Sequence, residues 1–153
     1  MEGVCVASFF RTAGLMLLML SLSTVARPVR AESVEVQAVT ATDPGKPVVI
    51  PASLKRFETQ LKEEPFGTFA DSGHDTVTAN AGGAGAANVG GYAVEVAVQS
   101  KAENGKLKVQ VTIKQGGKAL GQPWKTELVA GRPMRMKAGE AKAPVIFFFT
   151  FKE

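Results

Sequence analysis

The nonapeptide FADSGHDTV, residues 69–77, gathers the residue types of this chain that could do chemistry. It contains the single histidine, His74, between two aspartates, Asp71 and Asp75. Carboxylates that share a proton can activate water, and carboxylate and imidazole groups together can hold a metal ion. The same residue types also form turns. The plain alternative is therefore a solvated polar turn between a strand that ends at Asp71 and a strand that begins at Asp75.

A metal site in this segment would use Asp71, His74 and Asp75, which offer oxygen and nitrogen ligands for loosely held calcium or zinc. The chain has no second histidine, and its one cysteine, Cys5, lies near the N-terminus. No second ligand cluster therefore supports these three residues. The polar turn is the favoured interpretation, and we predict no metal and no other cofactor.

The Asp-Ser-Gly triplet, Asp71, Ser72 and Gly73, resembles the signature of retropepsin-like aspartic proteases. The glycine-rich stretch NVGGYAVEV, residues 88–96, is similar to the flap hairpin of that family. Residues 128–132 stand about where the family has an apolar-apolar-glycine motif. The resemblance implies an aspartic peptidase whose active site forms in a homodimer, where two Asp71 carboxyls share a proton.

The chain departs from that family at several places. Phe69 and Ala70 replace the two bulky residues that normally precede the aspartate, and Ala130 replaces a large residue of the later motif. The spacing from the triplet to the flap-like stretch is also short. These departures make the peptidase the alternative to a protein without catalytic residues.

A phosphate-loop interpretation arises at Gly85 and Gly90, which have the G-x-x-x-x-G spacing. Gly91 and Tyr92 then stand where a lysine and a serine or threonine would contact phosphate and magnesium. The segment also leads into an expected strand, so no helix N-terminus faces an anion. We therefore expect residues 79–91 to be a flexible connection.

One helix is expected over residues 51–64. Pro51 suits a first helical turn, and Leu54, Phe57 and Leu61 form an apolar stripe among charged residues. The proline that follows Glu64 ends the segment. Such a stripe is typical of a helix that packs on a sheet.

Beyond the helix the apolar period changes to two. Residues 92–99 and 107–114 alternate between apolar and polar side chains, and Asn104-Gly105 supplies the positive φ angles of a hairpin turn between them. Further turn signals predict short strands near residues 118–120, 124–129 and 133–137. The last run, APVIFFFTF over residues 143–151, is apolar on both faces. A strand of this kind belongs in the middle of a sandwich or under a helix.

Strands at short intervals, preceded by one helix, predict a mainly β fold: an antiparallel β-sandwich or open barrel with one N-terminal α-helix. We expect residues 51–153 to form a single β-rich domain. Residues 32–50 would precede it as a flexible N-terminal segment. Within that segment SVEVQAV, residues 33–39, would be a weak edge strand.

Residues 1–31 have the features of a signal peptide. Arg11 precedes an apolar run at residues 13–22, and small residues allow cleavage after Ala31 or Ala26. A membrane-spanning helix needs about 20 apolar residues, so we expect no stable membrane span after cleavage. The exported chain would lack cysteine and would lie in the periplasm, at the cell surface or outside the cell.

The charge of the exported part argues against a nucleic-acid partner. Residues 32–153 carry 15 basic and 13 acidic residues, and the basic ones are scattered. A nucleic-acid surface needs a clustered basic stripe. The lone tryptophan, Trp124, is either a packing residue or an exposed contact for a glycan or peptide.

Most of the chain also resembles small exported bacterial β-domain proteins of uncharacterised function. The similarity includes LKRFETQLKEEPFGTF, GGYAVEV, GKLKVQVTIKQGGKAL, AGRPM and VIFFF. Such a resemblance implies a fold more than an activity. We expect a non-enzymatic accessory or interaction module of the cell envelope whose partner is another envelope protein. After the peptidase, a loose metal- or small-ligand-binding protein is the third alternative.

Overall fold

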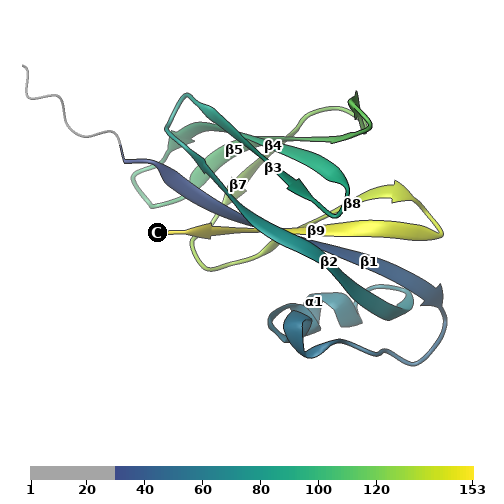
Figure 1. Cartoon of the computed structure of the whole chain (residues 1–153). Helices are drawn as coiled ribbons and strands as arrows, with labels where there is room; N and C mark the ends of the chain where they lie inside the picture. The colour runs from purple at the N-terminus through teal and green to yellow at the C-terminus, as the bar shows by residue number, and fades with distance from the viewer. Residues whose placement is uncertain (1–29) are drawn as a thin grey trace, which may run out of the picture.

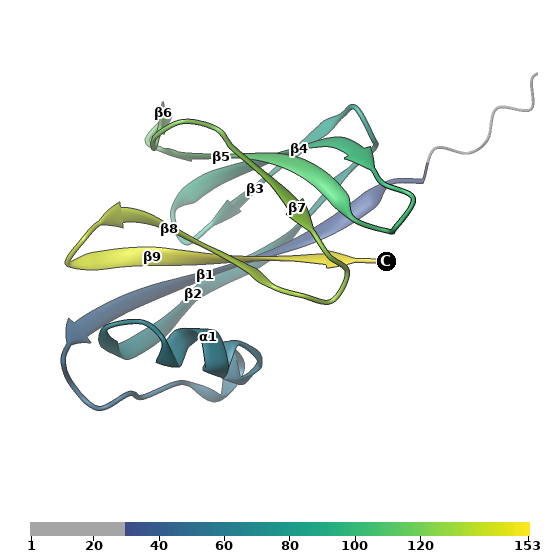
Figure 2. The same cartoon turned by 180° about the vertical axis from the view of Figure 1, so that it is seen from behind.

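The computed structural model describes residues 30–153 as two antiparallel β-sheets packed face to face, with a short helical segment on the outer side of one sheet (Figure 1 and Figure 2). The expected signal peptide, residues 1–31, lies outside the described residues except for its last two positions. Within residues 30–153, no helix has the length and apolar character needed to cross a membrane.

The first sheet has four strands in the order β2-β1-β9-β8: β1 (Glu32–Pro44), β2 (Phe66–Ala79), β8 (Met134–Glu140) and β9 (Ala143–Lys152). The second sheet has five: β3 (Ala84–Val89), β4 (Tyr92–Lys101), β5 (Leu107–Gln115), β6 (Lys118–Ala119) and β7 (Trp124–Leu128). Strand β5 pairs with β4 on one side and with both β6 and β7 on the other. For residues 30–153 the expected fold class is confirmed: mainly β, antiparallel, with one short α-helix and no closure into a barrel.

The four-stranded sheet buries apolar side chains on both of its faces. Its inner face meets the five-stranded sheet in the larger core, to which β1 contributes Val34, Val36 and Ala38. Its outer face carries a smaller core under the helical segment, which includes Val39 and Ala41 of the same strand. Because side chains alternate along a strand, one strand supplies both cores.

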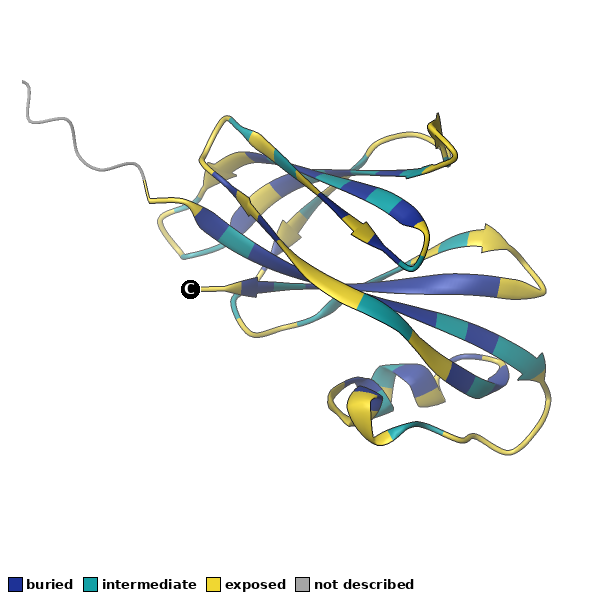
Figure 3. Ribbon diagram, viewed as in Figure 1, coloured by how far each residue is buried: buried dark blue, intermediate teal, exposed yellow. Residues whose placement is uncertain are grey.

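Strand β9 confirms the prediction made from its apolar run. Phe147 and Phe149 belong to the inner core, whereas Phe148 belongs to the outer one. Phe148 stacks on Phe57 of the helical segment with 4.1 Å between ring centroids. Figure 3 shows β9 buried over most of its length. The strand lies both in the sandwich and under the helix, so its apolar faces are covered on each side.

The expected single helix is divided into two short pieces, a 3₁₀ helix η1 (Ala52–Phe57) and an α-helix α1 (Glu58–Lys62). Leu54 and Phe57 are three residues apart, which matches the period of a 3₁₀ helix, and Leu61 follows at the α-helical spacing of four. All three side chains are buried against the sheet. Packing of this stripe on the sheet, rather than helix length, therefore determines the local geometry.

The hairpin of β4 and β5 is confirmed at the predicted turn, although Gly105 alone, and not Asn104, has a positive φ. Gly105 has a φ of 76°, and the Asn104 side chain accepts a hydrogen bond from the Lys106 backbone N–H at 3.2 Å. The register runs from Lys101 opposite Leu107 towards the start of β4. The two alternating sequences thus pair with their apolar faces on the inner core.

Two expectations about local structure were wrong. Residues 32–44 are neither a flexible segment nor an edge: they form β1, which pairs with β2 on one side and β9 on the other. The polar residues Glu35 and Gln37 give β1 the alternation of an edge strand, but distant side chains bury them. Residues 84–89, expected to be flexible, form β3, and Gly85 allows the β3 backbone to approach Thr78 of β2 closely.

Candidate functional site

The nonapeptide at residues 69–77 is not a turn, because it lies inside the continuous strand β2. The register places Ala38 opposite Gly73 and Val39 opposite Asp71, so Ser72 is an extra residue in β2. This arrangement is a β-bulge. Gly73 has a φ of 126°, which favours glycine at this position. The turn prediction was wrong because a bulge inside a strand uses the same small and polar residues as a turn between strands.

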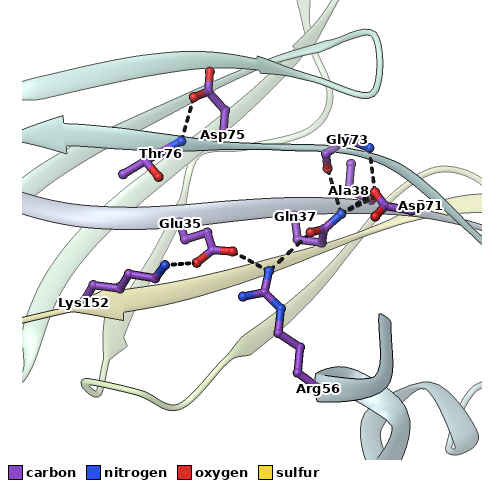
Figure 4. A network of polar contacts seen from close by, with 9 residues as sticks. All are labelled: Glu35, Gln37, Ala38, Arg56, Asp71, Gly73, Asp75, Thr76 and Lys152. Carbon is purple, nitrogen blue, oxygen red and sulfur yellow. Dashed lines mark hydrogen bonds and ion pairs between the residues drawn. The ribbon is translucent and has the colours of Figure 1, made fainter. Parts of the chain in front are cut away.

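The Asp71 carboxylate holds the bulge in place (Figure 4). Its Oδ1 accepts a hydrogen bond from the Gly73 backbone N–H at 3.0 Å and one from Gln37 Nε2 at 2.6 Å. Gln37 Nε2 also donates to the Gly73 carbonyl at 3.0 Å. Gln37 is 3% exposed, so the amide that fixes Asp71 is itself held by the fold.

A second carboxylate on the same face, Glu35, lies two residues before Gln37 on β1. It is 6% exposed and forms ion pairs with Arg56 of η1 and Lys152 of β9. The hydrogen bond from Arg56, assisted by the one from Lys152, outweighs the effect of burial and lowers the pKa of Glu35 to about 2. Glu35 is therefore a permanent anion at neutral pH.

Arg56 joins these two carboxylate sites. Besides its ion pair with Glu35, it donates to Gln37 Oε1 at 3.3 Å. We call the five residues Glu35, Gln37, Arg56, Asp71 and Lys152 the outer-face network. It lies on the outer sheet face beside the helical segment, and Figure 4 shows that its members come from four separate elements.

The peptidase interpretation needs the Asp71 carboxylate close to the flap-like hairpin, but the two lie on different faces of β2. Gly90, at the tip of the flap-like β3–β4 hairpin, lies so close to the inner face that an added Cβ would be 3.1 Å from Ala38 Cβ and 3.3 Å from Ser72 Cβ. Ser72 Oγ likewise lies 2.5 Å from Thr40 Oγ1. Asp71 instead contacts Gln37 on the outer face. The carboxylate and the flap-like hairpin are thus on opposite sides of the sheet.

The three candidate metal ligands also diverge. In the register His74 lies opposite Gln37 and Asp75 opposite Val36, so their side chains point to different faces of β2. Asp75 Oδ1 accepts a hydrogen bond from the Thr76 backbone N–H at 2.7 Å, and Figure 4 shows it turned away from Asp71. Among residues 30–153, no group of three His, Cys, Asp or Glu side chains is arranged to hold a metal ion.

A third buried carboxylate, Glu64, lies just after α1. Its side chain is 2% exposed and forms ion pairs with Arg135 at 2.9 Å and Lys137 at 2.5 Å, both on β8. Arg135 also donates to the Gln60 carbonyl at 2.6 Å. These contacts attach the helical segment to the edge of the four-stranded sheet.

Sequence reasoning found Asp71 but missed the residues that bind it. One signal was present: Glu35 and Gln37 share the strand face that carries the apolar Val39 and Ala41. Farther along the strand this face belongs to the apolar core. Polar residues on it therefore need hydrogen-bond or ion-pair partners. The identity of those partners, Arg56 and Lys152, depends on contacts across 21 residues and 117 residues of chain, which no local pattern encodes.

Trp124 at the start of β7 is intermediate between the packing residue and the exposed contact considered from the sequence. It lies opposite Val111 and packs against the inner core, yet it remains half-buried rather than enclosed.

A scan of family models, a search of curated proteins and a search of solved structures found no match for this chain. Its function is therefore inferred from its own geometry.

Proposed function

We propose that the chain is an exported, non-enzymatic interaction module of the cell envelope that binds another envelope protein through its surface. One observation carries the proposal: the carboxylates best placed for chemistry are occupied by contacts within their own fold. Asp71 accepts hydrogen bonds from Gln37 and Gly73, and Glu35 is held between Arg56 and Lys152.

The directions of the pKa shifts support a structural role for these groups. A general acid or base works best when its pKa lies near the operating pH. The pKa of Glu35 instead falls to about 2. A hydrogen bond from Thr68 lowers the pKa of Asp43, and one from Lys62 lowers that of Glu58. These carboxyls shift away from neutrality, as expected for ion-paired structural groups.

Export is supported by the sequence of the first 31 residues, with their apolar run and small residues before the cleavage site. The remaining chain contains no cysteine, so its fold does not depend on the redox state of the compartment. A domain of this size can be stabilised by its core alone, and the two cores on the faces of one sheet provide such packing.

Photo-crosslinking in the native host tests this proposal. A photoreactive amino acid is introduced at exposed or partly exposed positions around the molecule, one at a time: Lys62, Ala86, Lys114, Lys118 and Arg132. We expect at least one position to give an adduct with an envelope protein. The exported chain itself should begin at Glu32, or at Arg27 if cleavage follows Ala26. Absence of adducts at all five positions, or an exported chain that begins at Met1, would contradict the proposal.

A further inference from the structure

Strand β8 forms an edge of the four-stranded sheet, and among the described strands it pairs with β9 alone. The pairing is regular from Met134 opposite Phe149 to Glu140 opposite Ala143. The other side of the strand therefore presents backbone N–H and C=O groups that pair with no described strand. Such a row of groups is a template on which a further strand can pair.

The side chains around this edge are apolar and only half covered. The partly buried hydrophobic residues that pack against the inner core are Leu120, Trp124, Ala130, Met134, Met136 and Ala138. They come from one continuous part of the chain, residues 120–138, and we call them the open side of the sandwich. Strands β6 and β7 are too short, at 2 and 5 residues, to cover the inward-facing residues of β8 completely.

Hollows border β8 on both faces, so an added strand would have room for its side chains. One hollow of about 510 Å³ lies between Leu120 and Met136 on the inner side. Another of about 310 Å³ lies between Phe66 and Ala138, towards α1. A third of about 470 Å³ lies beside Met134 and Arg132 at the start of the strand.

The charge around the open side is positive. Residues 116–142 include six basic and two acidic residues. Arg135 and Lys137 are paired with Glu64. The exposed Lys118, Arg132 and Lys142 form no ion pair with any described residue. A second copy of this chain would bring the same cations to the edge, whereas an acidic partner would neutralise them.

We propose that the free edge of β8 binds an extended acidic segment of a partner protein, in which apolar residues alternate with carboxylates. The segment pairs with β8 as a fifth strand. Its apolar residues cover Met136 and Leu120, and the unpaired cations beside the edge, including Arg132 and Lys118, attract its carboxylates. Main-chain hydrogen bonds supply affinity in this mode of recognition, and pockets for alternate side chains supply specificity. The inference rests on the proposed function, since it names the surface and the kind of partner.

Fluorescence anisotropy with three labelled octapeptides tests the proposal on the exported protein. The first peptide alternates valine with glutamate, and the second alternates valine with lysine. The third has the sequence of the first peptide, but proline replaces its two central valines. We expect saturable binding of the glutamate peptide that weakens as salt is raised. The lysine peptide should bind at least tenfold more weakly because it meets like charges. The proline peptide should also bind at least tenfold more weakly because it lacks N–H donors for the strand pairing.

Matched variants locate the binding surface. Ala138→Asp places a carboxylate on the inner face of β8 and should weaken binding of the glutamate peptide at least tenfold. Ala86→Asp makes the same change on β3, which lies at the opposite edge of the sandwich, and should leave binding unchanged. The double variant Lys118→Glu, Arg132→Glu changes exposed residues only and should weaken binding to a similar extent as Ala138→Asp. It keeps the test valid if Ala138→Asp does not fold, which circular dichroism would reveal.

The outcomes separate this inference from the proposed function. Equal binding of the glutamate and lysine peptides, or full binding by the double charge variant, would overturn the β8 site. If crosslinks in the host form at Lys62, Ala86 or Lys114 but not at Lys118 or Arg132, the chain is an interaction module that uses another surface. If none of these positions gives an adduct and the glutamate peptide does not bind, both the inference and the proposed function fail.

Discussion

The two edge strands of the four-stranded sheet, β2 and β8, are protected to very different degrees. Along β2, the backbone N–H of Val49 donates to the Gly67 carbonyl at 2.7 Å, a bulge at Ser72 interrupts the middle, and β3 packs closely against Thr78 near the end. Strand β8 has an uninterrupted register, bordering hollows and half-covered apolar residues.

Natural β proteins protect their edge strands with bulges, charges or covering segments, because a free edge can pair with another chain. Strand β2, at one edge of this sheet, is protected by a bulge and by covering segments. The other edge is protected mainly by the basic residues beside it, and these repel a second copy without repelling an acidic partner. The contrast supports the proposal that β8 accepts an acidic segment of a partner protein.

The largest effect is expected where β3 covers β2. A Cβ at Gly85 would lie 2.7 Å from both the Thr78 carbonyl oxygen and Val77 Cγ1. Gly85→Val should therefore lower the free energy of unfolding by about 2–3 kcal/mol, since one of the contacting groups is backbone and has to move. Urea denaturation measures the change. The neighbouring exposed variant Ala86→Val should stay within about 0.5 kcal/mol of wild type. An unchanged stability in Gly85→Val would show that β3 does not cover this edge.

An intermediate effect is expected in the outer-face network beside β2. The shift in the pKa of Glu35 from 4.5 to about 2 corresponds to roughly 3 kcal/mol. Arg56 and Lys152 are about half exposed, so solvent reduces this contribution to about 1–2 kcal/mol. The native pKa is lowered, so the contribution is complete above pH 4.5 and is lost as the pH falls towards 2.

Glu35→Gln should accordingly be less stable than wild type at pH 7 by about 1–2 kcal/mol. The two proteins should converge in stability near pH 2. Unfolding measured at several pH values tests this dependence, and Glu103→Gln, at an exposed position, is the matched control. A difference that persists unchanged to pH 2 would mean that packing, not charge, makes Glu35 important.

The smallest effect is expected at the bulge itself. Asp71→Asn retains an oxygen acceptor for Gly73 and Gln37 but removes the charge, and it should cost about 0.5–1.5 kcal/mol. The exported wild-type protein should not cleave peptides at acidic pH, so the substitution should change no such activity. Cleavage that is sensitive to pepstatin and is lost in folded Asp71→Asn would instead establish the peptidase alternative.

The features that depend on the local period of the chain could be predicted from its sequence. Alternation and Asn104-Gly105 specify the β4–β5 hairpin, because side-chain direction and turn geometry are properties of neighbouring residues. The run in β9 is apolar at every position from Val145 to Phe149, so the strand had to be covered on both faces. The mainly β class with one helical segment followed from the same patterns.

The positions of the edge strands and the roles of the polar residues depend instead on contacts between distant segments. Val34 to Ala38 alternate like an edge strand, yet Arg56 and Lys152 bury the polar positions and β1 becomes internal. Residues 69–77 use turn-forming residue types, yet pairing with β1 converts them into a bulge. The physical reason is the same in both cases. Local preferences differ by about 1 kcal/mol or less per residue, and contacts with distant segments are strong enough to override them.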